Sequence, residues 1–276
     1  ARMEAGAAVG NNQVYIEKFI VQPRHIEFQV LADQFGNVVH LGERECSIQR
    51  RFQKLIEESP SPCLDQELRA RMGQAAIDAA RAMDYFNAGT VEFLLDGNGD
   101  FYFIEVNARI QVEHPGTELT TGIDLVKEQI RLSAGGKLDY AFDDLNLRGW
   151  AIECRINAED PERNFMPSPG TVESYHAPGG FGVRLDTHLY QGYELPIYYD
   201  SLVAKLVSFA LTREEAIDVM KRCLAEYTIE PLKTTIPLYS QVMDEPDFRA
   251  GNFDTSYIER FLPEEEDDAD DDDDDE

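Results

Sequence analysis

The sequence predicts an α+β fold, in which an antiparallel sheet with helices is followed by a second, smaller unit that also mixes helices and strands. Three observations support this prediction. Strand-like segments separated by turn signals fill most of residues 14–107, one long helical pattern interrupts them, and the composition changes at residues 135–147 before new strands begin. A chain of 276 residues is long enough for one large domain or two of ordinary size.

The first strands are marked by β-branched and aromatic residues at 14–20, 26–31 and 38–41, with turn signals between them, which predicts an antiparallel meander. The run that follows, residues 43–54, concentrates Arg, Lys and Gln side chains in an acidic protein. It is either a solvated basic loop or an edge that binds an anion, because Arg and Lys supply the charged donors that phosphate or bicarbonate needs.

A helix and a hairpin come next. Apolar and small residues recur at three- and four-residue steps over 65–85, which predicts a helix with Asp65 as its N-cap. Residues 90–95 and 100–107 are two predicted strands joined by the turn Asp-Gly-Asn-Gly, a strong hairpin signal.

This hairpin sets Glu92 opposite Glu105, or within one residue pair of it. Opposed carboxylates repel each other unless a positive group lies between them. Together with Asn107, they offer the oxygen ligands that Mg²⁺ or Mn²⁺ takes in proteins. Two exposed carboxylates that tolerate each other are the alternative.

Residues 105–113 carry a polar or charged side chain at every second position. An extended strand places these side chains on one face, and Pro115 ends it. A half-buried strand with its polar face in water explains the alternation alone. The choice of two carboxylates, two amides and a guanidinium instead favours a site that holds a divalent cation at one end and an anion at the other. The polar residues are Glu105, Asn107, Arg109, Gln111 and Glu113.

The rest of the chain divides by composition. We predict a first unit over 1–135, a linker over 136–148, a second unit over 149–262 and a disordered acidic tail over 263–276. The elements expected in it are a helix at 122–134 that Thr121 opens, a strand at 151–157, short strands up to residue 209, a helix at 213–227 with Thr212 and Glu215 as a capping box, and a last short helix that begins at 251–255.

Charge and cysteine content exclude several classes of protein. The net charge is −28, but 12 of residues 264–276 are acidic, which leaves −16 for the rest. An acidic body argues against nucleic acid as a partner, and no apolar run is long enough to span a bilayer. The four cysteines are scattered without Cys-x-x-Cys spacing, which argues against a zinc site. We expect a soluble cytoplasmic protein with reduced thiols.

Because the chain starts without Met on a helix-like segment, we also expect a fragment or a processed chain.

Several motifs, in this order along the chain, resemble those of the biotin carboxylase family of the ATP-grasp superfamily. The likeness covers residues 1–262, and each motif alone is weak. It implies an incomplete ATP-grasp domain followed by a biotin carboxylase C-terminal domain. The motifs are Glu17-Lys18-Phe19-Ile20, Pro23-Arg24-His25-Ile26-Glu27, Gln49-Arg50-Arg51-Phe52-Gln53-Lys54, Glu92-Phe93-Leu94, residues 105–115 and Cys154-Arg155-Ile156-Asn157-Ala158-Glu159-Asp160.

The resemblance implies ATP-dependent carboxylation of biotin on a carrier protein, with bicarbonate, Mg²⁺ or Mn²⁺, and carboxyphosphate as the intermediate. The implied partners are a biotin carboxyl carrier protein, carboxyltransferase subunits and a second copy bound through the C-terminal unit. No Met-Lys-Met segment is present, which favours a separate carrier. The acceptor that follows biotin, whether acetyl-CoA for fatty acid biosynthesis, propionyl-CoA or pyruvate, is not decided by these residues.

The resemblance also implies roles for individual residues. Glu113 would be the general base, and Arg155 would stabilise the enolate-like form of biotin; on its own, Arg155 could equally pair with Glu153 or Glu159. Asp200 would orient Arg155, and Phe52 stands where the family has His. The other implied contacts are Glu92, Glu105 and Asn107 with the metal; Arg109, Gln111 and the backbone of Val112 with bicarbonate; Lys54 with phosphate and bicarbonate; and Glu17, Lys18, Ile20, His25, Gln49 and Leu94 with ATP.

The family's first domain and the Gly-rich lid over the ATP phosphates would precede Ala1. We therefore expect residues 1–276 alone to have little or no activity. Two other interpretations stay open. One is another ATP-grasp ligase, such as a carbamoyl-phosphate synthetase or a purine-pathway carboxylase, against which residues 154–161 argue. The other is a non-catalytic chain that dimerises or binds the carrier.

Overall fold

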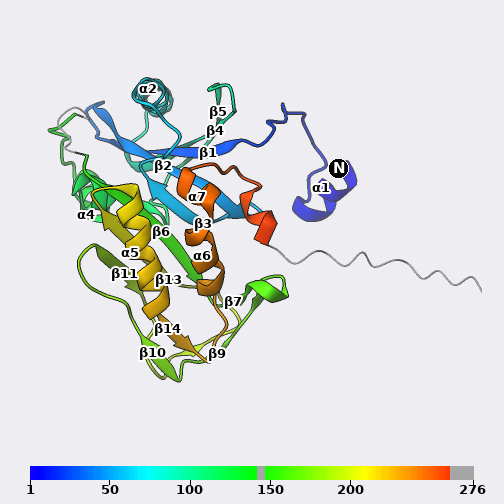
Figure 1. Ribbon diagram of the computed structural model, residues 1–276. Helices are drawn as coiled ribbons and strands as arrows, with labels where there is room; N and C mark the ends of the chain where they lie inside the picture. The colour runs from blue at the N-terminus through cyan, green and yellow to red at the C-terminus, as the bar shows by residue number, and fades with distance from the viewer. Residues whose placement is uncertain (142–146, 262–276) are drawn as a thin grey trace, which may run out of the picture.

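An eight-stranded antiparallel sheet runs through the whole molecule in the computed structural model, which describes residues 1–141 and 147–261 (Figure 1). The sheet confirms the predicted α+β class. Strands from both predicted units share it, because β3 of the first unit pairs with β6 of the second. In sheet order the strands are β11 (Val183–Thr187), β13 (Leu202–Ala210), β6 (Trp150–Asn157), β3 (Gln53–Ser59), β2 (Val38–Arg50), β1 (Arg24–Ala32), β4 (Asn87–Leu95) and β5 (Phe101–Asn107).

Two helices cover opposite faces of the sheet in the first unit. Alternation along β1 turns Ile26, Phe28 and Val30 towards α2 (Gln66–Ala82), where they form one buried cluster. The next residue, Leu31, joins a separate cluster with α4 (Leu125–Ser133) on the other face. Burying each large apolar side chain contributes about 1.5–3 kcal/mol, so these two clusters hold α2 and α4 on opposite faces of the sheet.

Three helices of the second unit share one buried cluster with β6 and β13, and these helices lie together in Figure 1. They are α5 (Arg213–Glu226), α6 (Ile236–Asp244) and α7 (Pro246–Ala250), of which only α5 was predicted. The smaller elements of the chain are α1 (Arg2–Val9), α3 (His114–Thr121), β7 (Glu159–Asp160), η2 (Pro161–Arg163), β8 (Met166–Pro167), β9 (Gly170–Thr171), β10 (Ser174–His176), β12 (Glu194–Leu195), β14 (Thr228–Glu230) and η3 (Tyr257–Phe261).

Several local predictions are confirmed. Asp65 caps α2 by accepting a hydrogen bond from the backbone of Leu68, and both hydrogen bonds of the capping box of α5 are present. The hairpin of β4 and β5 has Glu92 directly opposite Glu105. All four cysteines are free thiols. Within the described residues, no helix combines the length and the apolar content needed to cross a bilayer.

The predicted strand at 14–20 is wrong, because these residues form no regular structure. Ile16 is 99% exposed and Phe19 is 85% exposed. Their β-branched and aromatic content favours an extended strand only when a neighbouring strand can pair with it. No strand of the described ranges pairs with this segment.

Residues 43–54 are not a loop, as one interpretation held. They are the end of β2 and the start of β3, which turn at Arg51 and Phe52 with φ of 49° and 64°. Glu43, Arg44 and Glu45 are at most 1% exposed. This part of the strand has few of the apolar residues that mark strands. Its polar side chains are buried instead.

Residues 105–113 are a strand only as far as Asn107. The chain then turns, and Pro115 lies in the first turn of α3, where proline is well tolerated. Gly122 ends α3 with φ of 75°, a conformation that favours glycine. The predicted helix at 122–134 therefore begins three residues later, capped by Asp124 instead of Thr121.

At the C-terminus, the helix predicted to begin at 251–255 is a 3₁₀ helix that begins at Tyr257. The acidic tail and part of the predicted linker lie outside the described residues. Where the two units divide stays a prediction.

Candidate functional site

A row of charged side chains crosses four strands on the face of the sheet opposite α2. Arg44 of β2 pairs with Glu27 of β1, Glu27 pairs with Glu92 of β4, and Glu92 pairs with Glu105 of β5. Residues that pair across antiparallel strands point to the same face. Three carboxylates therefore lie side by side, and the cations around them decide their charge.

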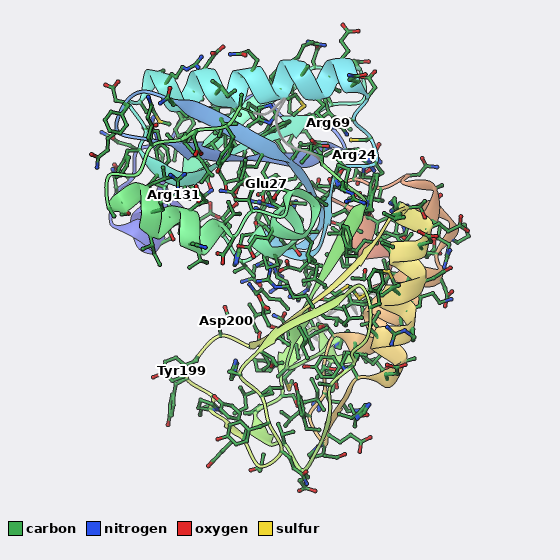
Figure 2. The ribbon with its side chains drawn as sticks, turned by 90° about the vertical axis from the view of Figure 1, so that its left-hand side faces the viewer. Arg24, Glu27, Arg69, Arg131, Tyr199 and Asp200 are labelled. Carbon is green, nitrogen blue, oxygen red and sulfur yellow. The ribbon has the colours of Figure 1, made fainter. Side chains whose placement is uncertain are left out.

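Arg44 and Lys54 neutralise Glu27, which lies inside the upper part of the molecule in Figure 2. Arg44 Nε donates to Glu27 Oε1 at 2.5 Å, and Lys54 Nζ donates to Glu27 Oε2 at 2.5 Å. Burial alone raises the pKa of Glu27, but the two cations outweigh it and hold the pKa at about 2. Glu27 is therefore a carboxylate at neutral pH.

Glu92 receives more hydrogen bonds than any other carboxylate of the row. Its Oε1 accepts from Lys54 Nζ at 3.1 Å, Gln111 Nε2 at 2.6 Å and Asn107 Nδ2 at 2.9 Å, and its Oε2 contacts His25 Nε2 at 2.7 Å. Burial raises the pKa of Glu92, but the hydrogen bond with His25 and the charge of Lys54 lower it to about 2.

The oxygen atoms of Glu92, Glu105 and Asn107 have the chemistry of a Mg²⁺ or Mn²⁺ site. The Asn107 amide nitrogen donates to Glu92 Oε1 at 2.9 Å and to Glu105 Oε1 at 3.0 Å, so one donor group bridges the two carboxylates. Rotating this amide by a half turn presents Oδ1 at the same place, which gives three hard oxygen ligands. Ligand atoms of His25, Glu27 and Glu92 also lie within 4.8 Å of one another, but the Lys54 ammonium already contacts both carboxylates.

Glu113 lies between two cations that come from different strands. Its Oε1 accepts from Lys54 Nζ of β3 at 2.7 Å, and its Oε2 accepts from Arg155 Nη2 of β6 at 2.9 Å. It is 2% exposed. Arg155 also donates from Nε to Glu57 Oε1 at 2.6 Å, and its other terminal nitrogen makes no hydrogen bond to the described residues.

The residues expected to bind bicarbonate differ in how many hydrogen bonds they already make to the described residues. Arg109 is exposed and donates only to the backbone carbonyl of Ile110 at 3.3 Å within the described residues. Gln111 is buried, and both ends of its amide are used, by Glu92 and by Arg44. The carbonyl of Val112 accepts from Lys205 Nζ at 3.1 Å. Arg109 is thus the side chain of this set that is available to an anion.

A cavity of about 460 Å³ joins these groups where the turn after β5 approaches β3 and β6. Phe52 and Asp200 also line it. The predicted site residues that it brings together are His25, Lys54, Glu92, Glu105, Asn107, Arg109, Gln111, Val112, Glu113 and Arg155.

Five predicted residues do not line this cavity. Gln49 lies behind it, with its amide nitrogen 3.5 Å from His25 Nδ1, and Leu94 pairs with His25 across β1 and β4. Lys18 Nζ donates at 2.7 Å to the hydroxyl of Tyr102, which pairs with Leu94 across β4 and β5. Glu17 is exposed and Ile20 is 8% exposed on the irregular segment before β1.

Asp200 does not orient Arg155. Figure 2 shows Asp200 and Tyr199 on a loop that stands out from the rest of the second unit, and the Asp200 carboxylate accepts from the backbone of Leu202 at 2.8 Å. Glu57 and Glu113 orient Arg155 instead, and it pairs with neither Glu153 nor Glu159.

Sequence reasoning missed Glu27, Arg44 and Glu57 as parts of the site. The alternation of His25 and Glu27 with apolar residues in β1 is the same signal that singled out residues 105–113, so Glu27 could have been found. Arg44 lies in residues 43–54, for which the sequence left a solvated loop and an anion-binding edge open. Glu57 reaches Arg155 only because β3 pairs with β6, a pairing between residues far apart in the chain.

Two family models match separate parts of the chain. Residues 1–141 match the family model described as the ATP binding domain of the carbamoyl-phosphate synthase L chain. Residues 153–260 match the family model of the biotin carboxylase C-terminal domain.

Curated relatives match almost the whole chain. Biotin carboxylase of Nostoc sp. is 58% identical over 259 residues, and biotin carboxylase 1 of Bacillus subtilis is 55% identical over 261 residues. Each match covers 94% of this chain but only 58% of the relative. The chain therefore spans little more than half the length of these relatives.

Solved structures agree with this result. The biotin carboxylase domain of a thermophilic 2-oxoglutarate carboxylase, bound to bicarbonate, has a TM-score of 0.90 and 52% identity and covers 94% of this chain and 59% of its own. Biotin carboxylase of Campylobacter jejuni, in a β,γ-ATP complex, has a TM-score of 0.90 and 49% identity and covers 94% of this chain and 58% of its own. A structure of the Hydrogenobacter thermophilus 2-oxoglutarate carboxylase domain is a dimer in complex with MgADP, ADP and bicarbonate.

Proposed function

Because the chain belongs to the biotin carboxylase family, we propose that it supplies catalytic residues for the ATP- and bicarbonate-dependent carboxylation of biotin on a carrier protein. One observation carries this proposal. Glu113, held between Lys54 and Arg155, lines the same cavity as the paired carboxylates of Glu92 and Glu105. This grouping supports a site in which a base, two cations and a metal ion would act on one small anion.

Glu113 would take the proton from bicarbonate. A general base must lie within hydrogen-bond reach of its substrate, and Glu113 borders the cavity beside Arg109. Arg109 would bind the anion through its planar fork, with Gln111 and the backbone of Val112 beside it. Gln111 would have to exchange its present partners, Glu92 and Arg44, to contact the anion directly.

Glu92, Glu105 and Asn107 would hold Mg²⁺ or Mn²⁺, which neutralises phosphate charge when it is bound. Lys54 would contribute a second positive charge near the phosphates and bicarbonate. Arg155 would stabilise the enolate-like form of biotin, because it lines the cavity and one of its terminal nitrogens makes no hydrogen bond to the described residues.

For the nucleotide, we propose contacts with Glu17, Lys18, Ile20, His25, Gln49 and Leu94, as in the family. We also propose a first unit over 1–135 and a second over 149–262, a cytoplasmic location, a homodimer formed through the second unit, and a biotin carboxyl carrier protein and carboxyltransferase subunits as partners. The dimer of the related carboxylase domain and the family model for residues 153–260 support the homodimer.

We further propose that residues 1–276 assayed alone have little activity. The chain covers 58% of the Nostoc relative, and a complete nucleotide site in this family needs more of that length. The comparison protein for activity is a chimera in which the Nostoc biotin carboxylase supplies the segments that this sequence does not cover. We call this chimera the completed enzyme.

The test measures biotin-dependent incorporation of labelled bicarbonate in both polypeptides. We expect ATP-dependent incorporation by the completed enzyme and little by residues 1–276. Incorporation by the completed enzyme that needs neither ATP nor biotin would refute the proposed reaction. Binding of the carrier protein by residues 1–276, with no nucleotide binding and no activity in the completed enzyme, would favour the non-catalytic interpretation.

A further inference from the structure

Two buried glutamates lie behind the cavity, where β3 meets β6. Glu57 and Glu153 are direct cross-strand partners, and they are 2% and 1% exposed. Paired residues share a face of the sheet, and Arg155, two residues further along β6, points to that same face. The two carboxyl groups therefore lie side by side next to the arginine that the proposed reaction uses.

Among the described residues, only one of the four carboxyl oxygens has a hydrogen-bond partner. Glu57 Oε1 accepts from Arg155 Nε at 2.6 Å. Glu57 Oε2 and both oxygens of Glu153 are buried and have no hydrogen-bond partner among the described residues. Two ionised carboxylates there would be desolvated, unpaired and mutually repulsive. One added proton removes the repulsion, because a neutral Glu153 can donate its O–H to Glu57 Oε2, which gives two of the three unpartnered oxygens a hydrogen bond.

The other charged groups around the pair form hydrogen bonds or ion pairs with other residues. From β3, Lys54 donates to Glu27, Glu92 and Glu113. From β13, Lys205 donates to the carbonyl of Val112 and pairs with Asp186 at 3.4 Å. Glu113, the residue directly before α3 in the chain, forms ion pairs with Lys54 and Arg155.

The remaining titratable neighbours are neutral. Burial raises the pKa values of Cys46, Cys154 and Tyr239 well above their ordinary values. The carboxyl groups respond in the same direction: burial raises the pKa of Glu57 to about 7, and burial and the charge of Glu57 raise that of Glu153 well above its usual range.

We propose that Glu57 and Glu153 share one proton, with Glu153 as the neutral acid, and that the single carboxylate of Glu57 is the positioning residue for Arg155. Glu57 then holds Arg155 through Nε, while Nη2 contacts Glu113. This role rests on the proposed function. When Glu113 accepts a proton as the base, it loses the charge that attracts Arg155, whereas Glu57 keeps the guanidinium in place.

Protonation of the pair is tested first, in the 276-residue chain, without any assay of activity. Glutamate side chains labelled with ¹³C at Cδ are titrated by NMR in the parent, in Glu153→Gln and in the control Glu214→Gln, whose side chain is exposed on α5. We expect one carboxyl group that is still protonated at pH 7 in the parent and the control and absent from Glu153→Gln. Complete ionisation of all glutamates at pH 7, or a protonated signal that survives in Glu153→Gln, would overturn the shared proton.

Positioning is tested through the Arg155 Nε–H signal and through rates. In the 276-residue chain, Glu57→Gln should shift this signal and speed its exchange with water, whereas Glu153→Gln, whose amide still donates to Glu57, should not. In the completed enzyme, Glu57→Gln should lower kcat for biotin carboxylation by about tenfold to a hundredfold and spare biotin-independent ATP hydrolysis.

The outcomes separate this inference from the proposed function. An Arg155 signal unchanged in Glu57→Gln would overturn the positioning role, and so would equal rates for Glu57→Gln and Glu214→Gln. If the parent completed enzyme carboxylates no biotin, the proposed function fails, and the two NMR titrations still decide whether the proton is shared and whether Glu57 positions Arg155.

Discussion

Replacing Arg44 by Met should destabilise the 276-residue chain strongly, because Arg44 holds together three strands and the start of α3. Its side chain is 1% exposed, and that of Glu27 is 0% exposed. Beyond Glu27, its guanidinium donates to Gln29, Thr90, Gln111 and Thr117. Methionine fills most of the volume but donates no hydrogen bond.

The size of the destabilisation follows from the buried groups that lose a hydrogen-bond partner. Removing one partner of a buried ion pair costs about 3–5 kcal/mol. Lys54 still contacts Glu27, which favours the lower end, while the side-chain oxygens of Gln29 and Gln111 each lose a donor at about 1 kcal/mol. We therefore expect a loss of about 5 kcal/mol, a large part of the ~5–15 kcal/mol of a typical domain.

Urea unfolding followed by circular dichroism measures this loss at pH 7. The control is Arg222→Met, because Arg222 pairs with Glu226 in the exposed part of α5 and such pairs contribute about 0–1 kcal/mol after solvent screening. Adding Glu27→Gln to Arg44→Met should recover part of the loss by removing the uncompensated charge. A loss below about 1 kcal/mol for Arg44→Met, equal to that of the control, would refute this reasoning.

Three further predictions concern stability and metal binding. The folded chain keeps the Glu153 proton, whereas the unfolded chain releases it above the ordinary pKa of glutamate. The unfolding free energy of the parent should therefore fall relative to that of Glu153→Gln as pH rises above about 4.5, by up to ~1.4 kcal/mol per pH unit. Parallel pH profiles from urea unfolding would contradict this. Glu105→Gln should raise the Mn²⁺ dissociation constant, measured by paramagnetic resonance, about tenfold or more, whereas Glu214→Gln should leave it unchanged; equal constants would contradict the proposed ligand. Thr212→Ala should cost about 0.5–2 kcal/mol because it removes the cap of α5, and thermal unfolding that matches the parent would exclude the capping contribution.

Local signals in the sequence predicted local structure well. The three- and four-residue spacing after Asp65 located α2, and the Asp-Gly-Asn-Gly turn fixed the hairpin register that sets Glu92 opposite Glu105. In both cases the residues that decide the structure are close in the chain. The carboxylate pair of the candidate metal site followed from this register.

The sequence could not show what depends on distant pairing. β2 reads as a basic loop because its buried polar residues are satisfied by Glu27, Gln111 and α3, which a short window does not contain. The segment at 14–20 has strand composition but no partner strand among the described residues. Glu57 reaches Arg155 through the pairing of β3 with β6, across about a hundred residues of chain.

The division of labour between Glu113 and Arg155 is tested most directly by one pair of rates in the completed enzyme: ATP hydrolysis that depends on bicarbonate, and carboxylation of free biotin. We predict that Glu113→Gln loses both activities, because no base takes the bicarbonate proton. Arg155→Ala should keep the hydrolysis and lose the carboxylation, because Arg155 acts on biotin. Bicarbonate-dependent hydrolysis that survives in Glu113→Gln, or carboxylation that survives in Arg155→Ala, would contradict the assigned roles.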